Sequence, residues 1–219
     1  HAQLLSGWAA REGLPVGIRI VTAEASPLAT FGPAASRRVA GVLAEAGIEL
    51  ICGSEPVLVS DTTMTAAGRW VTADRIVSLP RLAGPRIPGV PCDWHGFVKV
   101  DAVGAVPGCP GVYAAGDGAA HVCKQGGLAA QQADLAVREI LRGIGVSCPE
   151  PAEPSMLRGV LATTEGPLFL EATAGYGAPG GRSTASLRPL WDPPSKVATR
   201  WLSPHLDGLA RRQMSVSAI

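Results

Sequence analysis

The spacing of apolar positions predicts helices in three parts of the chain. Residues 2–11, 33–46 and 126–141 repeat apolar side chains at intervals of three and four, so we expect each helix to be amphipathic. The apolar positions of the first two helices are Leu4, Leu5 and Trp8, and then Val39, Val42, Leu43 and Ala46. Gly47 follows the second helix and is typical of a helix end.

Short apolar and β-branched runs predict strands between these helices. The runs at 17–21 and 48–52 flank the second helix, and this order predicts parallel pairing through a right-handed crossover. Further short runs predict strands at 57–60, 62–66, 69–72, 75–79, 96–100 and 112–115. Ala67-Gly68 predicts a hairpin turn between two of them.

The remaining segments complete a loop-rich α/β fold. Residues 80–93 contain four prolines and predict a long loop. After residue 148 the pattern predicts a proline-rich linker at 149–154, strands at 158–162 and 168–171, a glycine-rich loop at 175–181 and a helix at 195–202.

Composition limits the classes of protein to consider. The chain has 219 residues, of which 47% are hydrophobic and 17% charged, enough for a buried core in one domain or two small ones. The 19 basic residues nearly balance the 18 acidic ones, which argues against a nucleic-acid surface. No apolar run approaches the roughly 20 residues of a membrane span.

Cysteine spacing and the first residue add two expectations. Cys52, Cys92, Cys109, Cys123 and Cys148 form no C-x-x-C pair, which predicts free thiols, no metal site and a reducing, cytoplasmic location. The sequence starts with a histidine rather than methionine, which favours a processed chain or a fragment.

The residues with the clearest chemistry lie between 111 and 128. A short apolar run leads into Gly116-Asp117, where glycine lets the backbone approach a ligand and the carboxylate can accept hydrogen bonds from hydroxyl groups. Lys124-Gln125 precedes Gly126-Gly127, which opens a helix whose free N–H groups favour negative charge. Together these residues predict a site for a polyhydroxylated chain and an electron-rich ring.

Residues 111–133 resemble the second FAD-binding motif of the pyridine nucleotide-disulfide oxidoreductases. Lys124-Gln125-Gly126-Gly127 followed by Gln131-Gln132 resembles the branch of type II NADH dehydrogenases and sulfide:quinone reductases. The resemblance implies that Gly116 and Asp117 bind the ribityl chain of FAD. It also implies that Gln125 and the backbone of Gly126, Gly127 and Leu128 lie at the pyrimidine edge of the flavin, with Lys124 as a catalytic residue beside the ring.

Weaker resemblance extends along most of the chain. Residues 18–24 resemble the second strand of an NAD(P)-binding domain, which implies that Glu24 contacts the adenosine ribose. The implied organisation is the latter part of an NAD(P)-binding domain at 1–90, the second half of an FAD-binding domain at 91–148 and a C-terminal extension at 149–219. This is an incomplete FAD/NAD(P)-binding α/β fold with a C-terminal extension.

One departure from the family pattern affects the cofactor. No G-x-G-x-x-G lies on a strand–helix turn, so the loop that binds the FAD pyrophosphate in this family is missing. Without that loop a pyrophosphate loses several charge-assisted hydrogen bonds, and we expect this chain alone to bind FAD poorly or not at all. A companion chain or a missing N-terminal half would complete the site.

The implied function is FAD-dependent transfer of electrons from NAD(P)H to a quinone or another acceptor. Two alternatives stay open: a sulfide:quinone-type enzyme in which Cys123 carries sulfur, and a non-enzymatic subunit or regulatory module with a degenerate flavoprotein fold. At the level of single residues, Lys124 as a solvated cation, Cys123 as a small buried residue, His121 as a loop side chain and Glu24 as an ordinary strand-end carboxylate are the simpler interpretations. Besides a cytoplasmic location, peripheral association with a membrane stays open.

Overall fold

The computed structural model describes residues 1–79, 81–149, 155–173, 181–192, 199, 202–206 and 208–209. These residues form two compact units. Among the described residues, unit 1 holds 1–79, 81, 158–173 and 181–190, and unit 2 holds the rest. The expected division of the chain near residues 90 and 149 stays a prediction. Most of the predicted linker, glycine-rich loop and C-terminal helix lies outside the described residues.

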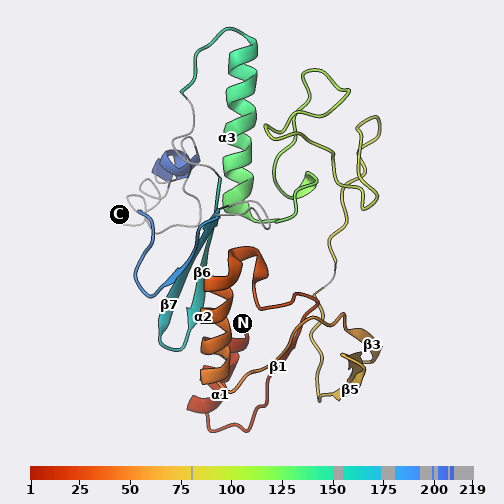
Figure 1. Ribbon diagram of the computed structural model, residues 1–219, viewed down its shortest axis with the longest axis vertical. Coiled ribbons are helices and arrows are strands. Elements are labelled where there is room, and N and C mark those ends of the chain that lie inside the picture. Colours follow the sequence, from red (N-terminus) through yellow and green to blue (C-terminus); the bar gives the residue numbers. More distant parts are fainter. Residues whose placement is uncertain are drawn as a thin grey trace, which may run out of the picture. The chain divides into compact units, whose positions relative to one another are not determined.

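Unit 1 contains the predicted strand–helix–strand element. Strands β1 (Arg19–Val21) and β2 (Glu49–Ile51) pair in parallel, and helix α2 (Gly32–Glu45) connects them after a short 3-10 helix, η1 (Ala29–Phe31) (Figure 1). The predicted parallel pairing is therefore confirmed. Gly47 ends the helix region with a φ of +67°, a conformation that favours glycine.

The core of unit 1 lies where α2 meets a second sheet. That sheet has the strand order β6 (Met156–Thr163), β7 (Gly166–Thr173) and β8 (Ser183–Ser186), with β7 and β8 antiparallel. The buried side chains are Ala35, Val39, Val42, Leu43, Ile48, Leu168 and Leu170. The predicted stripe of α2 and both predicted late strands are confirmed. Strand β8 went unpredicted because its sequence, Ser-Thr-Ala-Ser, lacks apolar alternation.

Helix α1 (Ala2–Arg11) has the predicted bounds, but its expected apolar face is wrong. Leu4 is 52% exposed, while Gln3 is buried and donates from Nε2 to the Val42 carbonyl oxygen at 2.7 Å. Ser6 Oγ also donates, to the carbonyl oxygen of Ala46 at 3.1 Å. The Val42 oxygen also accepts the Ala46 N–H at 3.3 Å, so Gln3 adds a second hydrogen bond to a carbonyl group at the C-terminal end of α2. These two side-chain hydrogen bonds join the polar face of α1 to the end of α2.

A separate antiparallel sheet in unit 1 consists of β3 (Val57–Ser60), β4 (Thr63–Ala66) and β5 (Arg69–Thr72). Ala67 and Gly68 both have positive φ, at 51° and 70°, as the predicted hairpin turn requires. The predicted strand at 75–79 is wrong. The described residues there form no strand, and Val77 and Leu79 are exposed, so the apolar run has no partner on which to pack.

The described part of unit 2 contains one long helix and little regular strand. Helix α3 (Gly126–Gly143) confirms the predicted helix and follows a short 3-10 helix, η2 (Gly116–Gly118) (Figure 1). The strands expected at 96–100 and 112–115 are wrong as regular strands. In their place, isolated bridges join Cys92 to Val98, Val98 to Ala119 and Ala105 to Tyr113.

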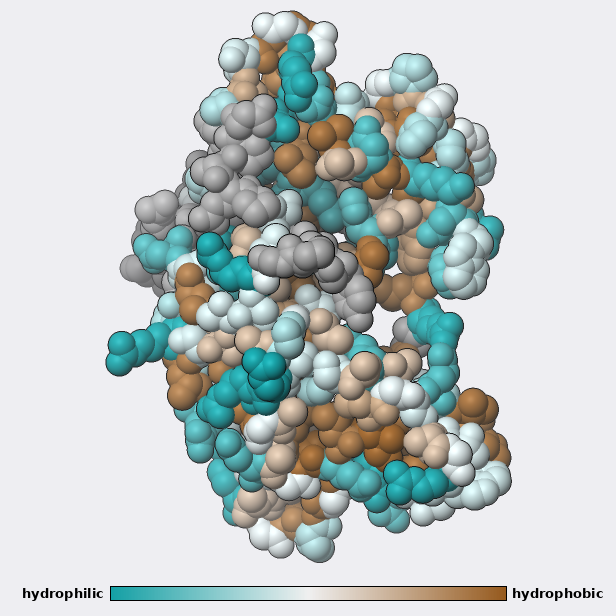
Figure 2. All heavy atoms as spheres, in the orientation of Figure 1, coloured by the Kyte–Doolittle hydropathy of each residue, from teal (hydrophilic) through white to brown (hydrophobic). Residues whose placement is uncertain are grey.

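Apolar and polar side chains are mixed on the visible surface. The face drawn in Figure 2 shows apolar residues beside hydrophilic ones rather than one continuous apolar face. Among the helices in the described part of the chain, none has both the length and the apolar character that crossing a membrane demands.

Candidate functional site

The backbone that leads to Asp117 is shaped by a tight turn. The Asp101 carboxylate accepts hydrogen bonds from the backbone N–H groups of Val103 and Ala105, at 3.0 and 2.9 Å. The N–H of Ala114 then donates to the Gly104 carbonyl oxygen at 2.8 Å. A Cβ atom at Gly104 would lie 3.0 Å from the Ala114 oxygen, and its φ is +84°. The two segments approach closely because position 104 carries no side chain.

Asp117 lies in η2, which packs against the first turns of α3. Gly116 has a φ of +75°, and a Cβ there would lie 3.1 Å from the Ala129 Cβ. Its N–H donates to Gln132 Oε1 at 2.8 Å. The Asp117 side chain is exposed, and no hydrogen bond or ion pair to it is found among the described residues. The carboxylate can therefore accept hydrogen bonds from a ligand.

The N-terminus of α3 is capped by Gln125. Its side-chain oxygen accepts a hydrogen bond from the Leu128 N–H at 2.9 Å, and its carbonyl oxygen accepts one from the Ala129 N–H. The Leu128 N–H, expected at the flavin edge, is therefore used within the helix, and so is the Gln125 side chain. Within the described part of the chain the N–H groups of Gly126 and Gly127 have no such acceptor. Both lie at the positive end of the helix dipole, where Gly126 is exposed and Gly127 is buried.

Lys124 is held by groups of its own unit. Its Nζ donates to the Ala119 carbonyl oxygen and lies 3.9 Å from the centroid of the Phe97 ring. Burial lowers the pKa of Lys124, while the nearby carboxylates of Asp117 and Asp93 act in the opposite direction. The structure thus brings Lys124 and Asp117 into one electrostatic neighbourhood. A catalytic role for Lys124 stays a prediction.

Two further titratable side chains belong to this neighbourhood. Burial, and then the charge of Asp117, raises the pKa of the Cys123 thiol, so the thiol form is favoured over the more nucleophilic thiolate. Burial, and then the charge of Lys124, lowers the pKa of His121. The His121 Nε2 is buried, and no hydrogen-bond partner for it is found among the described residues.

Glu24 lies in unit 1, beyond the end of β1. Its N–H donates to Thr22 Oγ1 at 3.2 Å, and its carbonyl oxygen accepts from the Gly53 N–H at 2.7 Å. Burial, and then the charge of Glu24, raises the pKa of Cys52, which follows β2. Glu24 therefore lies at the carboxyl ends of two parallel strands, where α/β proteins bind ligands.

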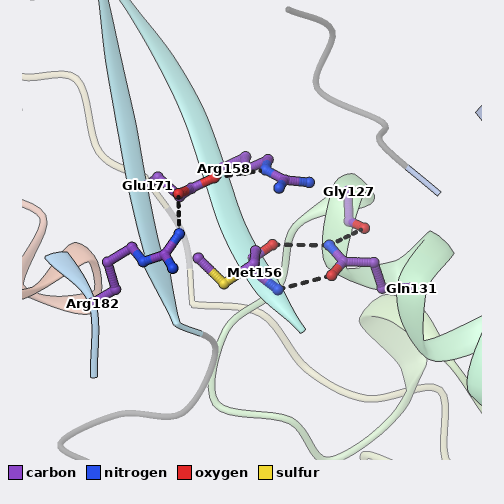
Figure 3. Close-up of polar contacts among 6 residues, drawn as sticks. All are labelled: Gly127, Gln131, Met156, Arg158, Glu171 and Arg182. Carbon is purple, nitrogen blue, oxygen red and sulfur yellow. Dashed lines mark hydrogen bonds and ion pairs between the residues drawn. The ribbon is translucent and has the colours of Figure 1, made fainter. Parts of the chain in front are cut away.

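Gln131 and Gln132 have contacts that the sequence did not indicate. The Gln131 side chain pairs with the backbone of Met156, donating to its oxygen and accepting from its N–H, both at 2.8 Å (Figure 3). The same Nε2 donates to the Gly127 oxygen at 3.1 Å. The first residue of β6 is thereby held to the second turn of α3, where Gln131 lies. The motif alone could suggest that the pair matters, but not which backbone groups it holds.

A charge cluster around a buried carboxylate in unit 1 was not predicted either. The Glu171 side chain, only 6% exposed, accepts from Arg158 Nε at 2.9 Å and lies 3.5 Å from a terminal nitrogen of Arg182 (Figure 3). These residues lie on β6, on β7 and just before β8, so the cluster ties the three strands together. Its partners neutralise a carboxylate that would otherwise be costly to bury.

The described residues form no metal-binding cluster, and the pocket in unit 1 does not include the predicted site residues. The described residues contain no group of three or more His, Cys, Asp or Glu side chains that could hold a metal ion. A shallow pocket in unit 1 is lined by residues of α2 and the β6–β7 turn, including Arg38, Glu45 and Thr164. No predicted site residue lines that pocket.

Comparison with known proteins then decides the family. The model of the pyridine nucleotide-disulphide oxidoreductase family matches residues 6–138, more than half of the chain. The chain belongs to this family. The match covers β1, α2 and β2 of unit 1 and the Asp117 turn and first turns of α3 in unit 2. No curated protein matches the chain in sequence.

Solved structures show the same fold. The sulfide:quinone oxidoreductase of Aquifex aeolicus has a TM-score of 0.67 and 16% identity, over 84% of this chain and 49% of its own. LpdA of Mycobacterium tuberculosis has a TM-score of 0.56 and 17% identity, over 78% of this chain and 38% of its own. An NAD-dependent persulfide reductase from A. fulgidus has a TM-score of 0.51 and 14% identity, over 74% of this chain and 32% of its own.

This chain spans about half the length of the sulfide:quinone oxidoreductase that it matches. The predicted superfamily and the predicted fold class, an incomplete FAD/NAD(P)-binding α/β fold, are confirmed. At these identities the solved structures show the fold and nothing more. The roles of the individual site residues stay predictions.

Proposed function

We propose that this chain supplies the ribityl and ring-edge half of an FAD site in a flavin-dependent oxidoreductase. The observation that carries the proposal is the turn at Gly116-Asp117, which presents an exposed carboxylate beside the N-terminus of α3. Among the described residues, the N–H groups of Gly126 and Gly127 have no acceptor at that helix end. A carboxylate suits sugar-alcohol hydroxyls, and helix N–H groups suit ring oxygens that gain negative charge on reduction.

The residues present fit this half of the cofactor. Bound FAD would accept a hydride and pass electrons on. Asp117 would accept hydrogen bonds from the ribityl hydroxyls, while the N–H groups of Gly126 and Gly127 would donate to the ring edge. Lys124 contributes positive charge in the same neighbourhood as Asp117. The glycine at 116 keeps the turn close to α3, because any larger residue would press on Ala129.

The proposal extends to the rest of the electron path. NAD(P)H would supply the hydride, with Glu24 contacting the adenosine ribose at the end of β1. A quinone or another acceptor would receive the electrons. A companion chain or further residues would supply the pyrophosphate-binding loop that the strand–helix turns of this sequence lack. We propose a cytoplasmic location, with peripheral membrane association as the alternative.

Two alternative functions have specific support. A sulfide:quinone-type reaction through Cys123 is supported by the fold shared with a sulfide:quinone oxidoreductase, although the raised pKa of this thiol disfavours the thiolate. A non-enzymatic module is the other alternative: no G-x-G-x-x-G lies on a strand–helix turn within residues 1–219. If Cys123→Ser leaves sulfide oxidation intact, the sulfur role is excluded.

Flavin titration tests the main proposal without requiring the missing loop. FMN keeps the ring and ribityl chain but lacks the adenosine half, and lumiflavin keeps only the ring. The poor binding expected for FAD concerns its pyrophosphate, which FMN lacks. We therefore expect the protein to bind FMN, and Asp117→Asn to weaken FMN binding about tenfold while changing lumiflavin binding less than about twofold. Asp74→Asn, at an exposed position in unit 1, is the matched control. Absence of FMN binding by the wild-type chain would favour the non-enzymatic module.

A further inference from the structure

Two adjacent side chains of α3 hold different parts of unit 2. Gln131 pairs with Met156, whereas Gln132 accepts a hydrogen bond from the Gly116 N–H at 2.8 Å. A backbone N–H can only donate, so its partner must be the side-chain oxygen of Gln132. Sixteen residues separate the two groups in sequence, and this contact joins η2 to the second turn of α3.

The position of Asp117 depends on how Gly116 is held. Gly116 is fixed on one side by its close approach to Ala129 and on the other by the bond to Gln132. Asp117 follows directly, and its side chain has no hydrogen bond or ion pair among the described residues. The backbone therefore sets where the carboxylate lies, and Gln132 supplies the polar restraint on that backbone.

We infer that Gln132 is a positioning residue that holds the Asp117 carboxylate in place for a flavin's ribityl chain. It acts through the Gly116 N–H and does not itself contact the ligand. This role rests on the proposed function. The chemistry requires an acceptor at position 132, which glutamate retains and methionine lacks at nearly the same length.

Amide hydrogen exchange in the flavin-free chain tests the restraint itself. We expect Gln132→Met to speed exchange at the Gly116 amide by about fivefold or more, because the N–H loses its acceptor. Gln132→Glu keeps an acceptor and should preserve the slow exchange. Gln131→Met is the matched control, since it removes an equivalent side-chain contact from the same helix turn but releases Met156. Unchanged exchange in Gln132→Met overturns the inference.

Flavin binding then tests the positioning role. We expect Gln132→Met to weaken FMN binding about tenfold and lumiflavin binding less than about twofold. Combined with Asp117→Asn, it should add little further loss, because both changes remove the same interaction. Equal losses for the two flavins, or losses that add in the double variant, would show a merely structural role.

The two proposals fail in different ways. If the wild-type chain binds FMN and Gln132→Met binds it equally well, the inference alone is overturned. If the wild-type chain binds no FMN, the proposed function is overturned together with the ligand-positioning role, whatever the exchange rates are.

Discussion

Residues 17–52 of unit 1 and residues 82–125 of unit 2 are held in shape by different interactions. In the first segment, β1 and β2 pair in parallel and α2 buries an apolar stripe in a shared core. In the second, isolated bridges replace strands, and the Asp93 and Asp101 carboxylates accept backbone hydrogen bonds. Burial of apolar area is non-directional, whereas a turn held by carboxylates and glycines depends on individual residues.

This difference bears on function. A core tolerates exchange of one apolar residue for another of similar volume. The segment that leads to Asp117 has no comparable freedom, because close backbone approaches and single hydrogen bonds define it. We therefore expect the effects of substitutions in the two segments to differ in size and in the part of the structure that they disturb.

The largest effect is expected at Gly84. A Cβ at this position would lie 2.0 Å from the carbonyl carbon of Gly96 and 2.1 Å from the Phe97 nitrogen. Gly84→Val should therefore prevent the native packing of the proline-rich loop, at a cost above about 4 kcal/mol. Thermal unfolding measures the loss. Gly143→Ala is the control, since a Cβ added there would meet no atom within 4 Å beyond its chain neighbours and the nearby backbone of its own helix. A wild-type melting temperature for Gly84→Val would contradict the close approach.

A smaller effect is expected in the core of unit 1. Leu168 is fully buried, and Leu168→Ala should reduce the free energy of unfolding by about 2–5 kcal/mol through lost burial and a cavity. Leu4→Ala, on the exposed face of α1, should cost less than about 0.5 kcal/mol. Urea unfolding followed by circular dichroism compares the two variants. Equal decreases in the free energy of unfolding would contradict the exposed position of Leu4 and support the inward apolar face that the sequence pattern predicted for α1.

The smallest effect concerns protonation of His121. Its pKa lies below the usual 6.5 because of burial and then the Lys124 charge. Between these two values the unfolded chain binds a proton that the folded chain does not. The neutral His121 therefore favours the folded state in full above pH 6.5. The free energy of unfolding then decreases as the pH falls from 6.5 toward the folded-state pKa. An NMR titration of the His121 ring should give a midpoint below 6.5.

Lys124→Met should move that midpoint upward, since it removes the second cause while burial remains. Arg142→Met is the control, because it removes a cation at the opposite end of the 18-residue helix α3, beyond the range of strong screened interaction. A midpoint that Lys124→Met leaves unchanged would show that the two side chains do not interact.

Sequence patterns predicted correctly the elements whose local pattern agrees with where their residues lie in the fold. The stripe of α2 is buried as predicted, and the turn at Ala67-Gly68 forms its hairpin. Patterns failed where long-range partners decided the outcome. In the part of the chain that the structure describes, the apolar run at 75–79 pairs with no strand, and the run at 112–115 forms one bridge, through Tyr113. Propensity describes a local preference, but a strand also needs a partner.

The same limit applies to the candidate site. The local sequence was sufficient to predict the glycine turn before Asp117, the helix that starts at Gly126 and the family to which the chain belongs. These features depend on backbone conformation and on the order of neighbouring residues. It could not show that Gln125 caps the helix, that Lys124 lies over Phe97, or that Gln132 holds Gly116. These contacts join groups whose pairing depends on how the chain folds back on itself. A side chain with several possible partners acquires one only when packing brings it within hydrogen-bonding distance.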